Sequence, residues 1–189
     1  MLLKTSRLRA IINNVARRPD LKNQNRVLWD KSTIKDGLDY LNKSAGGSEV
    51  SEYHLRAGIC ACHSLAKDYQ STDWMKIFSL YDQYLEINDS LEIALERAHL
   101  ISEFKGPRAG IESILRIDSK HKTDTSKLLN ASLAELYIKL NKYDKAIDHL
   151  SKSHKLSNTE KEKKLYLNKI DFCKQQLSLP KKYEEVLSF

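Results

Sequence analysis

Three neighbouring residues have side chains that could do chemistry: Cys60, Cys62 and His63. Thiolates and imidazoles bind zinc, and a thiolate beside an imidazole can act as a nucleophile. On a helix, however, Cys60 and Cys62 point about 200° apart, so the two sulfur atoms do not face one ion. His63 directly follows Cys62, a spacing that does not place a base against a thiol. We therefore interpret the cysteines as small buried hydrophobic residues and His63 as a packing or capping residue.

No other pattern for catalysis or metal binding occurs in the sequence. It lacks paired carboxylates, the spacing of a catalytic triad, and a second cysteine or histidine pair for zinc. The turn at Gly106-Pro107 with Gly110 is not a phosphate-binding loop, because it lacks the further glycines and the closing Lys-Ser/Thr. We therefore expect no enzyme activity, no cofactor and no metal ion.

The composition predicts helices. The chain has 189 residues, of which 41% are hydrophobic and 30% charged, and it has only six glycines and three prolines. These values exclude collagen-like, disordered and disulfide-rich classes and allow one domain or a small helical array. An odd number of cysteines without framework spacing indicates a reduced, cytoplasmic protein. No apolar run approaches the roughly 20 residues that span a bilayer, so we expect no membrane contact.

The net charge of +7 is concentrated at the ends of the chain. Residues 1–31 contain eight Lys or Arg against two acids, and residues 150–189 contain nine Lys against five acids. Basic ends could contact nucleic acid or an acidic protein surface. Because no aromatic residues alternate with the C-terminal lysines, we favour solvated helix faces there.

Hydrophobic periodicity gives a series of expected helices. The first runs from Met1 to Arg18 and stops at Pro19, and the second begins at Leu28-Trp29. The third helix, Tyr53–Ala66, is apolar nearly all round, which predicts a central position. A polar linker is expected over residues 119–126. The later expected helices are Tyr53–Ala66, Trp74–Ile87, Leu91–Phe104, Pro107 to about Ile117, and Thr159–Leu177.

The most informative stretch is Asn130–Asn158, which predicts two helices joined by two or three residues. Such helices must pack antiparallel. Ala134 and Ala146 lie where the two backbones would approach most closely. These small side chains would let Tyr137 and Leu150 interlock across the pair.

This pattern of small, aromatic and aliphatic residues resembles a tetratricopeptide (TPR) hairpin, whose period is about 34 residues. Ala98 and Gly110 are twelve residues apart, as are Ala134 and Ala146. The turn Gly106-Pro107 lies between Ala98 and Gly110. A second hairpin therefore repeats the first with an offset of 36 residues. One hairpin cannot bury its apolar face alone, so neighbouring helices should complete it.

The predicted fold is all-α: a TPR-like helical-hairpin array, or right-handed α-α superhelix, of about eight helices. Residues 1–48 form an N-terminal helical pair leading into the array. Residues 49–178 form the repeats and a C-terminal capping helix, with a third hairpin over Tyr53–Asn88. Residues 179–189 form a tail.

Several segments, in order, resemble a more specific family. They are Asn23–Asp30, Tyr53-His54-Leu55, Thr72-Asp73-Trp74, Leu80-Tyr81-Asp82, Ala94-Leu95 with Arg97-Ala98, Gly106-Pro107 with Ala109-Gly110, and Leu128–Tyr137. Their order is similar to the C-terminal extension of a family of extracytoplasmic-function RNA polymerase sigma factors, which ends in a TPR-like domain. The resemblance covers roughly residues 1–178. Asn23, Asn25 and Glu96 depart from the family pattern, which has acids at the first two positions and an amide at the third.

The resemblance implies a regulatory domain that contacts the sigma core or RNA polymerase during bacterial transcription initiation. In that family, two domains that bind DNA and polymerase precede this region, so DNA would be reached only through them. We therefore expect an excised domain or a protein without the sigma core. The alternative is a free-standing TPR scaffold that binds a peptide or partner protein. A nucleic-acid binder using the basic N-terminal helix is a third possibility.

The candidate partner-contact residues are aromatic or charged positions in these motifs: Arg26, Trp29, Asp30, Tyr53, Trp74 and Tyr81. For Trp29 and Asp30, the structural alternative is a core anchor followed by the cap of a helix that starts near Lys31. The later aromatic residues, with Tyr84, could line a concave peptide groove, or could fill the core between helices.

Overall fold

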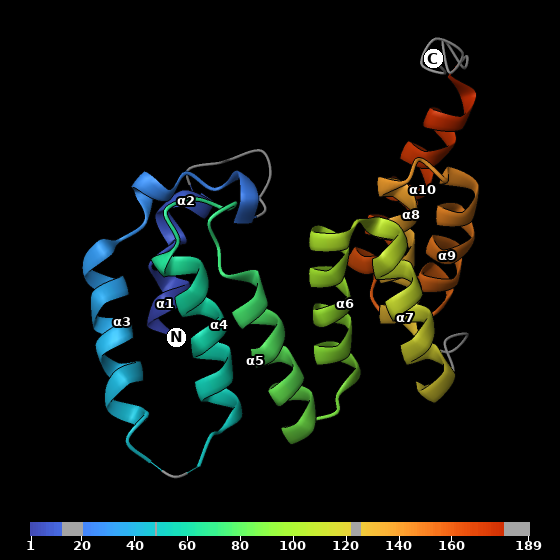
Figure 1. Cartoon of the computed structure of the whole chain (residues 1–189). Coiled ribbons are helices and arrows are strands. Elements are labelled where there is room, and N and C mark those ends of the chain that lie inside the picture. The colour runs from blue at the N-terminus through green and yellow to red at the C-terminus, as the bar shows by residue number, and fades with distance from the viewer. Residues whose placement is uncertain (13–20, 48, 122–125, 180–189) are drawn as a thin grey trace, which may run out of the picture. The chain divides into compact units, whose positions relative to one another are not determined.

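A computed structural model describes residues 1–12, 21–47, 49–121 and 126–179. The described residues form helices joined by turns and loops and contain no strand, which confirms the all-α class. The chain divides into two compact units, Met1–Asp89 and Ser90–Phe189 (Figure 1).

In the first unit, the short helix α1 lies between α3 and α4 (Figure 1). Two 3-10 turns precede α3, and α4 packs on α5. The elements are α1 (Leu2–Thr5), α2 (Leu8–Ile12), η1 (Leu21–Asn23), η2 (Arg26–Leu28), α3 (Lys31–Ser44), α4 (Glu52–Leu65) and α5 (Trp74–Ile87).

The prediction of a single helix over Met1–Arg18 is wrong for the residues that the structure describes. The helix is interrupted between α1 and α2. The Ser6 carbonyl accepts a hydrogen bond from the Asp30 N–H at 2.9 Å, in place of the amide that a continuous helix would supply. The Ser6 hydroxyl in turn donates to the Leu3 carbonyl at 3.0 Å. Residues 13–18 lie outside the described residues.

The second expected helix starts later than Leu28-Trp29. Trp29 has an extended backbone, and α3 begins at Lys31. The Asp30 carboxylate accepts a hydrogen bond from the Thr33 N–H at 3.0 Å, which satisfies a free amide of the first turn.

Two packing contacts join the helices of this unit. Leu3 packs with Cys60 and Ala61 into a core that α3 completes with half-buried side chains. A Cβ atom at Gly58 would lie 3.2 Å from a methyl carbon of Leu80, so the missing side chain lets α4 lie against α5.

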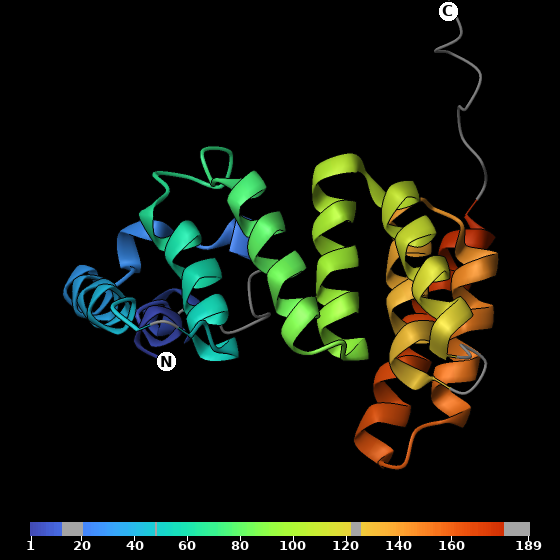
Figure 2. The same ribbon diagram turned by 60° about the horizontal axis from the view of Figure 1, so that its bottom comes forward.

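In the described part of the second unit, five consecutive helices each pack on the next (Figure 2). The polar linker expected from Ser119 starts too early, since α7 continues to His121. Residues 122–125 and the expected tail from Pro180 lie outside the described residues. The elements are α6 (Leu91–Lys105), α7 (Pro107–His121), α8 (Lys127–Lys139), α9 (Tyr143–Lys155) and α10 (Glu160–Ser178).

Helices α8 and α9 pack as their residue spacing predicts. Ala134 and Ala146 are both 0% exposed and share a core with Leu150. Tyr137 is half-buried and packs against this core and against the neighbouring one. Asn141 takes a left-handed backbone (φ 55°) in the turn.

Helices α6 and α7 are joined by a sharper turn. Gly106 has φ 90°, a conformation that L side chains rarely adopt, and Pro107 is the first residue of α7. Ala98 is fully buried on α6. A Cβ atom at Gly110 would lie 2.6 Å from the Cβ atom of Ser102, so glycine is required where α7 crosses α6.

Candidate protein-interaction groove

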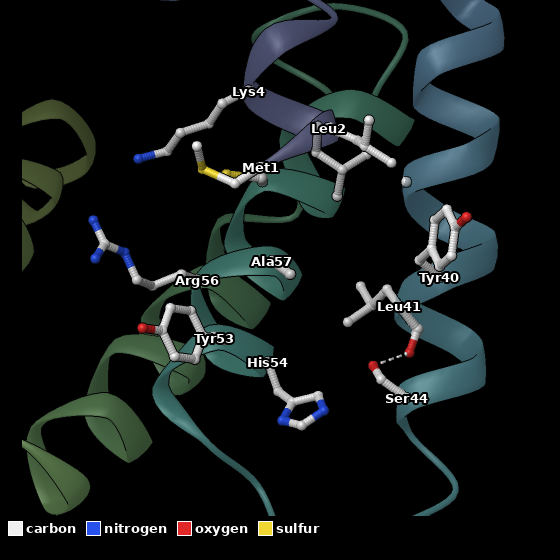
Figure 3. A pocket seen from close by; sticks show the side chains of 13 residues that line it. Met1, Leu2, Lys4, Tyr40, Leu41, Ser44, Tyr53, His54, Arg56 and Ala57 are labelled. Carbon is white, nitrogen blue, oxygen red and sulfur yellow. Dashed lines mark hydrogen bonds between the residues drawn. The ribbon is translucent and has the colours of Figure 1, made fainter.

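A groove of about 570 Å³ lies among α1, α3 and α4 of the first unit (Figure 3). Most of its lining is apolar: α1 contributes Leu2, α3 contributes Tyr40 and Leu41, and α4 contributes Tyr53 and Ala57. We call this site the α1/α3/α4 groove.

The groove explains why α4 is apolar nearly all round. One face carries Leu55, which is buried. Another face carries Tyr53 and Ala57, which line the groove. The expectation that this whole helix is central is therefore corrected, because Tyr53 is 83% exposed.

Large side chains at this groove are open to solvent. Tyr40 is 66% exposed, and Leu2 and Met1 are also exposed. A contiguous exposed apolar surface on a folded protein commonly marks a binding site. The arrangement can take up the apolar side chains of another molecule.

The charges at the groove are all positive. Lys4 and Arg56 line it together with His54, and among the described residues no Asp or Glu does so. Neither Lys4 nor Arg56 forms an ion pair with a carboxylate in the part of the chain that the structure describes. His54 is engaged, since its Nδ1 accepts from the Ser51 N–H (3.1 Å) at the start of α4.

Arg26 lies outside the groove and joins η2 to the end of α4. Its Nη1 donates to the carbonyls of His63 (2.6 Å) and Ala66 (2.7 Å) at the end of α4. Its guanidinium carbon lies 4.5 Å from the centre of the Trp29 ring. Arg26 thereby satisfies carbonyls that the end of a helix leaves free.

Trp29 and Asp30 also belong to the internal structure. Trp29 is 5% exposed, and the Arg7 guanidinium carbon lies 5.6 Å from its ring centre. Asp30 caps α3, and this contact lowers the pKa of its carboxyl group. The structural alternative is confirmed for both residues, and neither lines the groove.

His63 is a neutral residue in this interior. Burial, and then the charges of Arg7 and Arg26, lower the pKa of His63 to about 4. Its ring lies edge-on to Trp74, with 5.5 Å between centroids. An imidazole held neutral among cations is a packing residue, as expected.

The two cysteines of α4 differ in burial. Cys60 is buried in the core beside Leu3, and Cys62 is half-buried. Burial raises the pKa of the Cys62 thiol, which favours its protonated form. Within the described ranges, no three Cys, His, Asp or Glu side chains gather in a way that could hold a metal ion.

The aromatic candidates do not converge on one groove. Trp74 and Tyr81 are half-buried on α5, and Tyr84 is buried with its hydroxyl donating to Glu52 (3.3 Å). Tyr53 alone among the partner-contact candidates lines the α1/α3/α4 groove. Partner contact by the others stays a prediction.

Of the lining residues, the sequence analysis predicted only Tyr53 as a contact, and the large side chains it missed include Lys4, Tyr40 and Arg56. Lys4 was counted only in the charge of the N-terminal segment. The signal for a second exposed wall was the all-round apolar character of α4, which we interpreted as burial. Tyr40 gave a weaker signal, as an aromatic residue outside the apolar stripe of α3.

The chain is 30% identical over 114 residues to the uncharacterized protein R00370 of Rhizobium meliloti (strain 1021). The match covers 60% of this chain but 27% of the relative, so the chain spans about a quarter of that protein's length. No family model matches the chain, and no solved structure matches it. Among the described helices, none is long and apolar enough to cross a membrane.

Proposed function

We propose that this chain is the regulatory interaction domain of a bacterial extracytoplasmic-function RNA polymerase sigma factor. It would act in the cytoplasm, during transcription initiation, through contacts with the sigma core domains or RNA polymerase. Its helices would form a TPR-like, right-handed α-α array. The observation that carries the proposal is the exposed α1/α3/α4 groove with Tyr53 on its wall.

The internal roles of the motif residues support the resemblance. Arg26, Trp29 and Asp30 fall in the most distinctive motif, and they join the N-terminal segment to α4 and cap α3. The 36-residue offset between hairpins agrees with a helical repeat. These three residues therefore have internal structural roles, whereas Tyr53, in another of the motifs, lines the exposed groove.

The groove suits that contact. Exposed tyrosines such as Tyr40 and Tyr53 offer large, rigid contact area, and aromatic residues are enriched at protein interfaces. Polar groups at the rim could fix the orientation of the partner. A regulatory domain without catalytic groups would work in this way, by binding.

The test is calorimetric titration of the chain into a family sigma core, made as its two upstream domains, and separately into core polymerase. Binding to either target supports the proposal. The variant Tyr53→Ala/Tyr40→Ala should weaken binding at least about tenfold, as for truncated aromatic anchors. Met75→Ala is the control, because Met75 is exposed on α5 and does not line the groove.

The second candidate is a free-standing TPR-like scaffold that binds a peptide or partner protein. The open groove favours it, since its volume of about 570 Å³ accepts several side chains of a peptide. Absence of binding to both sigma core and polymerase would overturn the first proposal in favour of this one.

A further inference from the structure

We infer that the α1/α3/α4 groove takes one amphipathic helix of the partner protein, with acidic residues beside the apolar face of that helix. This inference rests on the proposed function, because it names the chemistry of the segment that the regulatory domain would bind. It is carried by the lining, the surrounding helices and the charge of the groove.

The apolar lining of the groove favours an occupant with an apolar face. Leu2, Tyr40, Leu41 and Ala57 lie around the groove, and Figure 3 shows them on α1, α3 and α4 around a common space. Ala57 is small, which leaves room for a large side chain of the occupant beside Tyr53. Burial of such a side chain is the main attraction that this surface can provide.

The elements around the groove favour a helix as the occupant. An extended peptide gains much of its affinity by adding to the edge of a sheet, and the described residues form no strand. A helix instead lays apolar residues at i, i+3, i+4 and i+7 between other helices. The groove has such helical walls on α3 and α4.

The positive charge of the groove favours an occupant helix with acidic residues beside its apolar face. Lys4 and Arg56 extend to the same side of the view in Figure 3, away from Tyr40 and Leu41. Since no carboxylate of the described ranges lines the groove, this basic edge has no counter-charge among the lining residues. Acidic side chains on the occupant would supply it and fix the direction in which the helix lies.

The same charge argues against two other occupants. A second copy of this chain, docked groove against groove, would bring its own Lys4 and Arg56 toward the same cations. A nucleic acid would meet the cations, but it would leave the exposed Leu2 and the apolar wall of Leu41 unused. Both occupants are outcomes of the test below.

The test is a selection from a phage-displayed library of helical peptides with randomised surface positions, against the full chain biotinylated at its C-terminus. We expect a consensus with apolar residues at i, i+3, i+4 and i+7 and with Asp or Glu beside them. Tyr53→Ala should weaken binding of a selected peptide at least about tenfold. The double variant Lys4→Glu/Arg56→Glu, panned against the same library, should select Lys or Arg at the acidic positions.

Lys67→Glu/Lys76→Glu is the matched control, because both lysines are exposed and neither lines the groove. This variant should select the same acidic consensus as the unaltered chain. Selection of extended proline-rich or basic peptides would overturn the inference, as would no enrichment or binding that Tyr53→Ala leaves unchanged. Sedimentation that shows dimers through the groove, or tight binding of a random DNA duplex lost in Lys4→Glu/Arg56→Glu, would replace the helix with those occupants.

The two proposals fail in different ways. If Tyr53→Ala weakens binding of the sigma core but Lys4→Glu/Arg56→Glu does not, the acidic helix is wrong and the proposed function stands. If acidic helical peptides bind as expected but neither sigma core nor polymerase binds, the helix site stands and the proposed function is wrong.

Discussion

The guanidinium carbon of Arg26 lies 4.5 Å from the centre of the Trp29 ring, while its Nη1 donates to two carbonyls at the end of α4. One side chain therefore covers a buried indole and completes the end of a helix that lies far away in the sequence. The N-terminal segment and α4 depend on each other through this contact.

Replacement of Arg26 should destabilise the first unit. Arg26→Ala removes two charge-assisted hydrogen bonds and a cation–π contact, and should lower the free energy of unfolding by about 2–4 kcal/mol. Arg26→Lys should recover only part of this, since an ammonium group cannot stack on the indole as a planar guanidinium does. Urea unfolding followed by tryptophan fluorescence measures the effect, because both tryptophans lie in the first unit.

The control is Arg56→Ala, which removes an exposed arginine without an ion-pair partner among the described residues. Its unfolding free energy should stay within about 0.5 kcal/mol of the unaltered chain. Equal losses for Arg26→Ala and Arg56→Ala would contradict the role that we assign to Arg26.

The neutral His63 should make the first unit sensitive to acid. Its pKa is about 4 in the folded chain, below the ordinary 6.5, so the unfolded chain binds a proton over this range and the folded chain does not. The stabilising contribution is complete above about pH 6.5 and is lost as the pH falls toward 4. The free energy of unfolding should fall by up to about 3 kcal/mol across this window.

His63→Gln should flatten that pH dependence in the same fluorescence assay. Asp30 and Asp68 have lowered pKa values because their carboxylates accept hydrogen bonds near the chain turns they close. Their contributions are present above the ordinary carboxyl pKa of about 4 and are lost as the pH falls through their lowered values, mostly below the window of His63. An unchanged slope between pH 6.5 and 4 in His63→Gln would show that another group titrates there.

Any side chain at Gly110 should disturb the contact between α6 and α7. Gly110→Ala places a Cβ atom 2.6 Å from that of Ser102, and this overpacking should cost about 1–3 kcal/mol, with Gly110→Leu at or above the upper end. Thermal unfolding by circular dichroism measures the loss. Gly47→Ala is the control, because nothing lies within 4 Å of a Cβ atom there.

A second substitution locates the clash. Ser102→Gly removes the atom nearest to the added Cβ, so Gly110→Ala should cost less in that background than in the unaltered chain. A double-mutant cycle gives the coupling energy between the two sites. Simple additivity would mean that the helices do not meet at this pair.

The hairpin of α8 and α9 could be predicted because its determinants are local. Ala134 and Ala146 lie on the two helices of one hairpin. Their complete burial follows from the spacing of small and large residues around them. The break after α1 could not be predicted in this way. It depends on the hydrogen bond between Ser6 and Asp30, which are far apart in the sequence and which no local periodicity connects.

The α1/α3/α4 groove could be predicted only in part. The apolar residues of α4 were visible, but periodicity cannot choose a face when a helix is apolar nearly all round. Only the packed structure shows that Leu55 faces the core and that Tyr53 faces solvent. The burial of Trp29 could not be predicted for the same reason, since it depends on distant residues such as Arg7.

Met1 is itself part of the lining of the α1/α3/α4 groove. Any polypeptide joined ahead of Met1, whether an affinity tag or a fused domain, would therefore leave the first unit at the mouth of its binding site. Such an extension would reach the groove at a high effective concentration and would compete with partners added in solution. Labels for affinity measurements on this protein accordingly belong at the opposite end of the chain.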